Sequence, residues 1–193
     1  MKTLEEQALE TLQSARETYE SMGHDNFEPM LHIVQEGDEH DAVIMMVGVP
    51  TGALYEAVQR VLVEIPLKPE IIFVINDAYG VRMPINMDDK ARAYEEAQIA
   101  LGEIGLRVPL SRRFAEGDPR VSEQLTVTAL SAVRSVSIVQ VYRWTPVDKW
   151  EWDEPMVNDA NGSDWVWDRL VNGRPKPTVA EMMSKTKENG VKE

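Results

Sequence analysis

The strongest constraint on the fold is an uninterrupted apolar run near the middle of the chain, Ile71 to Ile75 (Ile-Ile-Phe-Val-Ile). The run is rich in β-branched residues and too short for a buried helix, so it predicts a strand that is covered on both faces. A strand of this kind lies inside a sheet. We therefore expect an α/β domain that is built around this strand.

Composition limits the class of protein and its partners. The 193 residues are 43% hydrophobic and 27% charged, which suits one domain with its own core. Lys and Arg total 20 against 33 Asp and Glu, a net charge of -13 that repels nucleic-acid phosphates and anionic membranes. We expect no membrane partner, and nucleic acid is a poor candidate. The acidity serves solubility or, in the alternative, mimics nucleic acid toward a basic partner.

Cysteine and targeting signals are both missing from the sequence. Without cysteine the chain forms no disulfide, thiolate metal site or cysteine nucleophile, which fits a reducing compartment. The first residues lack the apolar core of a signal peptide, and no apolar run approaches the length of a membrane span. These features predict a soluble, cytoplasmic protein.

The first half of the chain carries signals for a helix and a hairpin. Thr3 to Glu6 has the form of a capping box, and helical spacing of apolar residues continues to Gly23. Two strands are then expected over 27–35 and 42–49, joined by a polar turn. Pro29 predicts an edge position for the first of them. The second is apolar on both faces, which predicts a deeper position.

The second half predicts the remaining elements. Thr51 is placed to cap a helix that ends near Pro66, which would make the strands on either side of it parallel if they share one sheet. A further helix is expected from Asp88 to Glu103, followed by a second hairpin over 121–131 and 135–143. The resulting order is helix, hairpin, helix, strand, helix, hairpin, in a mixed sheet of about five strands.

Changes in composition divide the chain into three parts. Residues 1–143 are expected to form a single α/β domain that includes the N-terminal helix. Residues 144–173 hold all five tryptophans together with many carboxylates, and are expected to form an acidic strap. Residues 174–193 have few large apolar groups and are expected to be a partly disordered tail.

The predicted order of elements resembles that of zinc nucleoside deaminases and of metalloprotease-like deubiquitinase domains. A zinc deaminase needs a His or Cys ligand followed by a glutamate at its second helix, and a Pro-Cys-x-x-Cys pair later. Here Thr51 to Glu56 contains no ligand and the chain has no cysteine. Deaminase chemistry is therefore excluded.

Other cofactor signatures are also missing. The sequence has no P-loop, no Gly-x-Gly-x-x-Gly fingerprint and no Gly-x-Ser-x-Gly elbow. His32 and His40, with carboxylates close by, would allow a two-histidine metal site at the tip of the first hairpin. A solvated polar turn explains the same residues. We predict no metal and no cofactor.

Two groups of residues are candidates for binding. The first joins polar residues that follow the central run with a basic loop, where arginines would bind an anion and Asp77 would act as a base. Its members are Asn76, Asp77, Tyr79, Arg82, Arg112, Arg113, Asp118 and Arg120. The alternative is that Asn76 and Asp77 satisfy turn backbone and that the arginines offset an acidic surface.

The second group is the set of tryptophans that would contact a partner, Trp150, Trp152, Trp165 and Trp167. Tryptophan anchors with a polar rim are favoured at protein interfaces. The alternative is that the segment straps over the sheet and buries its own rings. The alternating spacing of these tryptophans favours the strap, since it is typical of extended chain.

Short motifs add a resemblance that covers Met30 to Arg143. Asp77 and Tyr79 follow the buried run, and Asp118-Pro119-Arg120 with Glu123 precedes the last hairpin. In this the chain is similar to a loose family of small uncharacterised α/β proteins from actinobacteria and their phages. The resemblance supports the fold, and a host cytoplasm if the protein is phage-encoded. It implies no activity.

Together these patterns favour a non-catalytic function. We expect an acidic binding protein, regulatory or accessory, that acts through contacts with a protein partner or with itself. One alternative is a small-molecule-binding protein or a hydrolase-type enzyme with its site at the carboxyl end of the central strand. Another is a structural subunit of a larger assembly.

Overall fold

The predicted buried strand lies in β3 (Pro69–Val81), which pairs with a different strand along each edge. Ile71 to Ile75 are all buried, so the prediction of an interior strand is confirmed. The prediction that the strand ends with this run is wrong, because the ladder with β4 (Val121–Leu130) continues to the end of β3. Asn76 and Asp77 therefore lie inside a strand and not at its carboxyl end.

The computed structural model describes residues 2–23, 27–37, 41–49, 53–65, 67–81, 110–119, 121–145, 149–160 and 164–172. The described helices are α1 (Leu4–Met22), α2 (Leu54–Glu64), α4 (Leu110–Ala115) and α5 (Asp164–Val171). The remaining strands are β1 (Met30–Gln35), β2 (Ala42–Met45), β5 (Ser135–Thr145), β6 (Lys149–Trp152) and β7 (Met156–Ala160).

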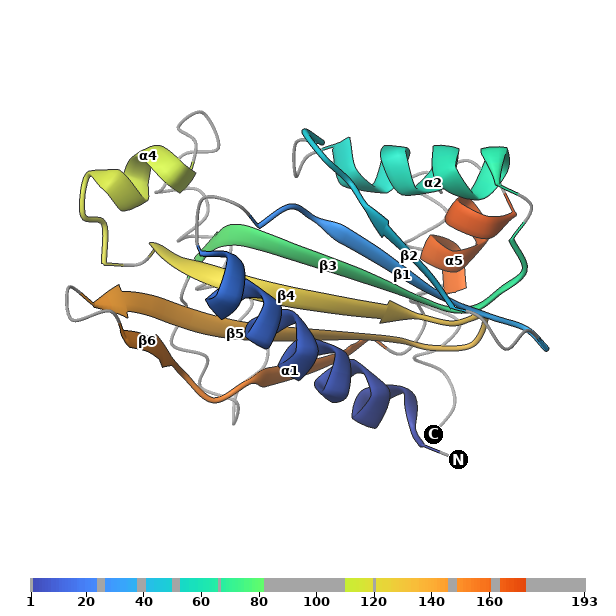
Figure 1. The fold of residues 1–193 in the computed structure, drawn as a ribbon, viewed down its shortest axis with the longest axis horizontal. Coiled ribbons are helices and arrows are strands. Elements are labelled where there is room, and N and C mark those ends of the chain that lie inside the picture. Colours follow the sequence, from blue (N-terminus) through green and yellow to red (C-terminus); the bar gives the residue numbers. More distant parts are fainter. Residues whose placement is uncertain are drawn as a thin grey trace, which may run out of the picture.

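The strands form one open sheet with helices on both faces (Figure 1). Their order is β2-β1-β3-β4-β5-β6, β7 also pairs with β5, and each pairing is antiparallel. The α/β class is thus confirmed, but the described residues form a sheet of seven strands instead of about five, and the prediction of a mixed sheet is wrong because every described pairing is antiparallel. The two additional strands, β6 and β7, come from the tryptophan-rich segment.

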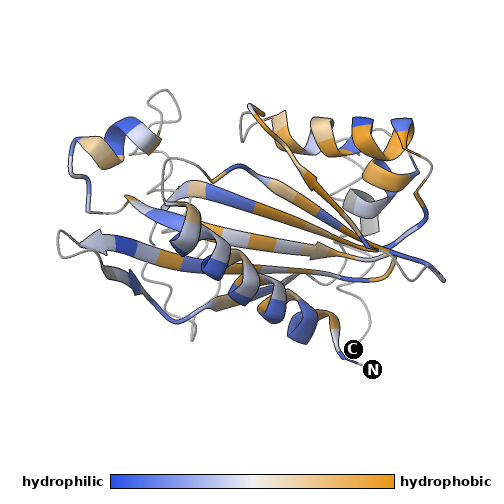
Figure 2. Ribbon diagram, in the orientation of Figure 1, coloured by the Kyte–Doolittle hydropathy of each residue, from blue (hydrophilic) through white to orange (hydrophobic). Residues whose placement is uncertain are grey.

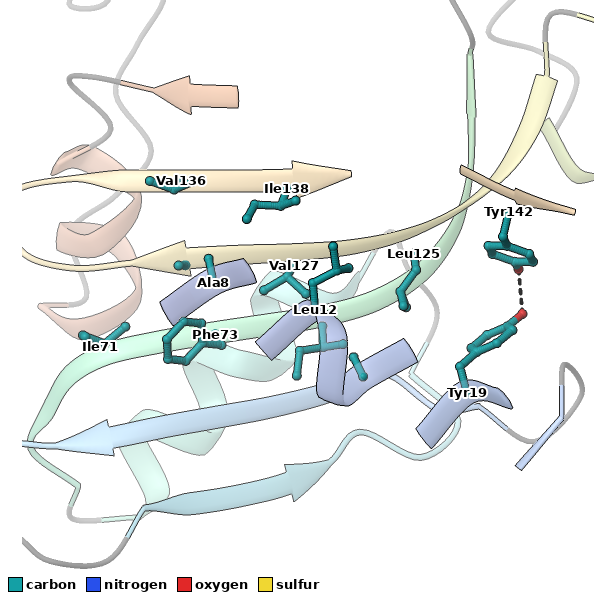
Figure 3. Close-up of a cluster of buried hydrophobic side chains, with 13 residues drawn as sticks. Ala8, Leu12, Tyr19, Ile71, Phe73, Leu125, Val127, Val136, Ile138 and Tyr142 are labelled. Atoms are coloured by element: carbon teal, nitrogen blue, oxygen red, sulfur yellow. Dashed lines mark hydrogen bonds between the residues drawn. The ribbon is translucent and has the colours of Figure 1, made fainter. Parts of the chain in front are cut away.

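Helix α1 covers one face of the sheet and has the ends that its sequence predicts. Thr3 and Glu6 form the capping box, and Gly23 ends the helix with a φ of 80°, which glycine adopts without strain. Figure 3 shows the core beneath the helix. This core contains Ala8, Leu12, Ala15, Tyr19, Ile71, Phe73, Ile75, Leu125, Val127, Ala129, Val136, Ile138 and Tyr142.

Helices α2 and α5 cover the opposite face. Side chains of β3 alternate between the faces, so Ile72 and Val74 belong to this second core while their neighbours face α1. The helices contact each other, and Trp167 and Leu170 of α5 are buried three residues apart on one helical stripe. The second core contains Leu31, Ile33, Met46, Leu54, Val58, Ile72, Val74, Leu130, Trp167 and Leu170.

In the first hairpin the edge and interior positions of the two strands are opposite to those predicted. β1 lies between β2 and β3, and β2 is the edge strand. Pro29 precedes β1, so no N–H is missing from the ladder, and its carbonyl accepts a hydrogen bond from the N–H of Met46. Since β2 and β3 both run antiparallel to β1, they are parallel to each other, as predicted, although they are not neighbours.

Gly80 lies inside β3. It is opposite Ser122 of β4, and the side chain of Gln124 occupies the space that a Cβ at position 80 would fill. Glycine within a strand often marks a close approach of this kind. Gly80 therefore serves packing.

The tryptophan-rich segment continues the sheet. Trp150 and Trp152 lie in β6, so their predicted extended conformation is confirmed. Trp165 and Trp167 lie in helix α5, so the same prediction for that pair is wrong. The periodicity of two such residues does not distinguish a strand from a helix, and here burial of one helical stripe against α2 favours the helix.

Candidate functional site

Asp77, the proposed base, faces α1 and contacts two tyrosines. The hydroxyl of Tyr142 donates to Oδ1 of Asp77 at 2.8 Å, and that of Tyr19 donates to Oδ2 at 3.2 Å. The two hydroxyl oxygens are 2.6 Å apart (Figure 3). Both tyrosines are buried, whereas Asp77 is half-buried. One carboxylate therefore ties α1, β3 and β5 together.

Burial controls the protonation of these hydroxyls. It raises the pKa of Tyr142 above the ordinary value, and the charge of Asp77 adds to the increase. Burial also raises the pKa of Tyr19, against an opposing contribution from its hydrogen bond with Tyr142. Both hydroxyls therefore stay protonated at neutral pH, so both remain hydrogen-bond donors within the cluster.

Two tryptophans cover this cluster. The ring centroids of Trp150 and Trp152 lie 5.2 and 6.0 Å from that of Tyr19, and 5.8 and 5.1 Å from that of Tyr142. Trp152 Nε1 donates to Glu20 at 2.7 Å. The two rings thus pack against the cluster and are half-buried, an arrangement that stabilises the attachment of β6 to α1.

The end of β3 also meets the predicted basic loop. Helix α4 of this loop contacts β3 and β4, and the ring centroids of Phe114 and Tyr79 are 5.3 Å apart. Burial raises the pKa of Tyr79, and the charges of Glu123 and Asp77 raise it further. Helix α4 therefore lies against the predicted strand segment at Tyr79.

The predicted arginines are only partly described. Arg112 Nε pairs with Glu116 at 2.9 Å, and both side chains are exposed. Arg113 is half-buried on α4, and its carbonyl accepts a hydrogen bond from the N–H of Asp118. Arg82 and Arg120 lie outside the described residues. A joint anion site of these arginines with Asp77 stays a prediction.

Asn76 is separated from Asp77 by the alternation of the strand. It faces α2 instead of α1, and its side chain is 7% exposed. Its Oδ1 is buried without a hydrogen-bond partner among the described residues, while its backbone carbonyl accepts from Thr126 Oγ1 at 3.0 Å. The two residues therefore do not form one site, although they are adjacent in sequence.

The edge strand β2 presents apolar side chains to solvent. Val43 is 65% exposed and Met45 is 49% exposed. The Met46 N–H points to β1, where it donates to the Pro29 carbonyl at 2.7 Å. Backbone groups alternate in direction along an antiparallel strand, so those of Val43 and Met45 point away from β1. In the described part of the chain, no strand pairs with this outer edge.

A groove of about 380 Å³ runs between α1 and the strands beside this edge. It exists because α1 packs on β3, β4 and β5, and the described helices leave the same face of β1 and β2 uncovered (Figure 1). The wall on α1 is polar and contains Gln7, Glu10, Thr11, Ser14 and Thr18. The sheet side is mostly apolar and contains Met30, His32, Val34, Asp41, Val43, Phe73 and Ile75.

Sequence reasoning missed this edge. The apolar stretch from Ala42 to Val49 was interpreted as an interior strand because it carries no charge. The edge position of the first strand was predicted from Pro29. Since Pro29 lies before β1 and does not interrupt it, that argument does not hold, and the second strand is left as the candidate for the edge. An uncharged strand at an edge is unusual and therefore informative.

The described residues contain neither a metal-binding cluster nor a helix that could cross a membrane. In the ranges that the structure describes, no cluster of three His, Asp or Glu side chains is arranged to hold a metal ion. His32 Nε2 lies 2.8 Å from Asp41 Oδ2, whereas His24 and His40 are outside those ranges. None of the described helices is long and apolar enough to cross a membrane.

Comparison with known proteins identifies no relative: the chain matches no family model, no curated protein sequence and no solved structure. The resemblance to small actinobacterial and phage proteins thus stays a prediction. Function has to be argued from the geometry described above.

Proposed function

We propose that this chain is a non-catalytic binding protein that acts by accepting an extended segment of a protein partner along β2. The observation that carries the proposal is the outer edge of this strand, which is uncharged and pairs with no strand in the described residues. Proteins usually protect such edges with charged residues, proline or a covering element, because an open edge pairs readily with other chains. An edge left open is suited to binding by strand addition.

Side chains and backbone at the edge support the same function. Val43 and Met45 direct their backbone groups outward and expose their side chains, and Val47 beyond them is 70% exposed. The apolar colour of β2 is visible in Figure 2. A partner strand would gain backbone hydrogen bonds and would also cover apolar surface.

The tryptophans give less support to partner binding. Trp150 and Trp152 pack against the first core and Trp167 is buried in the second, while the side chain of Trp165 lies outside the described residues. Buried rings stabilise the fold and are not available to a partner. We therefore assign the partner contact to β2 and not to the tryptophan-rich segment.

The alternatives have weaker support. An enzyme or small-molecule site at Asp77 would require access to a carboxylate that two buried tyrosines already contact. The deaminase-like order of elements, the cytoplasmic location and the role as a structural subunit stay predictions, and the helix expected from Asp88 to Glu103 lies outside the described residues.

The proposal is tested by selecting peptides from a random library against the wild-type protein and then measuring their binding to Met45→Pro. Proline at position 45 removes an N–H that faces outward and leaves the β1 ladder intact. We expect the selected peptides to lose at least tenfold in affinity. Val133→Thr, which changes a distant side chain that is 86% exposed, is the control and should bind normally.

Circular dichroism is used to verify that Met45→Pro is folded. Peptides that bind wild type and a folded Met45→Pro equally well, or a library that yields no binder, would contradict strand addition at β2.

A further inference from the structure

We infer that the partner segment accepted by β2 is basic and apolar, and that the alternate side chains that face the α1 side of the groove are apolar except for at least one Lys or Arg among them. This inference rests on the proposed function and adds the chemistry of the partner. It follows from the shape of the groove and from the charges at its rim.

The floor of the groove determines the apolar positions. Every second side chain of a strand paired with β2 would lie on the same face as Val43 and Met45. On that face the groove continues over Met30 and Val34 of β1, which are half-buried. Apolar side chains of the partner would therefore remove this surface from water.

Two carboxylates at the rim determine the charge. Glu10 on α1 and Asp41 before β2 both line the groove, and their side chains are 58% and 45% exposed. Each already has a partner, because Lys2 Nζ lies 2.7 Å from Glu10 and His32 Nε2 lies 2.8 Å from Asp41. Exposed pairs of this kind are weak and exchange readily, so a cationic side chain of the partner can share the carboxylates.

The charge of the whole chain argues against a second copy as the occupant. Each copy carries -13, so two copies repel each other, whereas a basic segment is attracted. Pairing over the four residues of β2 also buries much less surface than the roughly 1,200 Å² of a stable protein interface. A short basic segment is not repelled, because its positive charge is opposite to the negative charge of the chain.

The test uses two fluorescein-labelled peptides that have valine at every second position and serine between, with the central valine replaced by lysine in one and by glutamate in the other. Binding is followed by fluorescence anisotropy. We expect the lysine peptide to bind at least tenfold more tightly than the glutamate peptide and to weaken as salt is added. Glu10→Gln combined with Asp41→Asn should reduce this preference several-fold. Glu151→Gln, an exposed carboxylate on β6, is the matched control and should leave it unchanged.

The outcomes separate this inference from the proposed function. If both peptides bind wild type equally well and neither binds Met45→Pro, the inference of a basic partner is wrong and strand addition at β2 is supported. Binding of the lysine peptide that persists in Met45→Pro would overturn both. A wild-type dimer in light scattering that becomes monomeric in Met45→Pro would show that a second copy occupies the edge.

Discussion

The cluster of Asp77, Tyr19 and Tyr142 has more oxygen–oxygen contacts than hydroxyl protons that can bridge them. With Asp77 ionised, two hydroxyl protons serve three oxygen–oxygen contacts of 2.6, 2.8 and 3.2 Å. The two short contacts fit full hydrogen bonds, and the longest is the one that has to share a donor. The geometry is therefore a chain of hydroxyls that ends on the carboxylate, with the Tyr142 hydroxyl at its centre.

Removal of the Tyr142 hydroxyl tests this arrangement. Tyr142→Phe deprives Asp77 of its shorter hydrogen bond, so the free energy of unfolding should fall by about 2 kcal/mol. Urea denaturation measures the change. Tyr55→Phe is the control, because its hydroxyl bonds the neutral side chain of Thr128 and not a charged group, so its loss should cost less. A loss no larger than that of the control would show that the cluster does not hold α1 to the sheet.

At Asn76 we predict a substitution that raises the free energy of unfolding. Its Oδ1 is buried with no acceptor contact in the described residues, which costs free energy in the folded state. Asn76→Val removes the unpaired acceptor and adds a residue that strands favour, so the free energy of unfolding should rise by about 1 kcal/mol. A lower melting temperature in this variant would mean that the amide contributes a stabilising contact.

At the scale of elements, β2 combines two functions along four residues. Its inward groups hold it to β1, and its outward groups form an edge with which no described strand pairs. Ala42 and Ile44 pack into the second core on one face, whereas Val43 and Met45 are exposed on the other. The strand is therefore anchored by alternate residues and leaves the others available.

Proline substitutions at neighbouring positions test the assigned direction of the backbone. The N–H of Ile44 faces β1, so Ile44→Pro should lower the free energy of unfolding by about 3 kcal/mol. Met45→Pro should change it by less than about 1 kcal/mol, since its N–H faces outward. Thermal melting followed by circular dichroism compares the two. Equal destabilisation would contradict the direction that we infer from the Met46 hydrogen bond.

At the scale of the molecule, buried tyrosines make stability depend on alkaline pH. Tyrosines of the unfolded chain ionise near pH 10, whereas burial raises the pKa of Tyr19 and Tyr142 in the folded chain. Above about pH 10 the folded state thus binds more protons than the unfolded state. The stabilisation is complete below this pH and is lost as the pH rises toward the folded pKa values.

This linkage predicts how steeply the free energy of unfolding falls with rising pH. Two tyrosines that keep their protons only when folded should lower the free energy of unfolding by up to about 2.7 kcal/mol per pH unit above about pH 10. Urea denaturation at several alkaline pH values measures this slope. The double variant Tyr19→Phe, Tyr142→Phe should show a shallower fall. An identical slope in the variant would assign the effect to other groups.

Patterns that depend only on neighbours in sequence were predicted well. The capping box at Thr3, the end of α1 at Gly23 and the β4–β5 hairpin all appear where the sequence indicates them. Each rests on local hydrogen bonding or on the side-chain period of one element. The buried run of β3 was found for the same reason, because burial on both faces requires a continuous apolar stretch.

The candidate site depended on information that no local pattern contains. Asn76 and Asp77 were predicted to act together, but the extension of β3 places them on opposite faces. Tyr19 and Tyr142 are 58 and 65 residues from Asp77 along the chain, so only packing of α1 onto the sheet brings them together. No signal in a single sequence identifies such distant partners.

By itself, then, the sequence determined the class of fold, the capped helix α1, the interior strand β3 and the acidic character of the surface. Only the tertiary structure decided that β2 and not β1 lies at the edge, and that Asp77 binds tyrosines on the α1 face. The physical reason is that strand order and register arise from pairing between distant segments, whereas helix caps and apolar periods are properties of one segment.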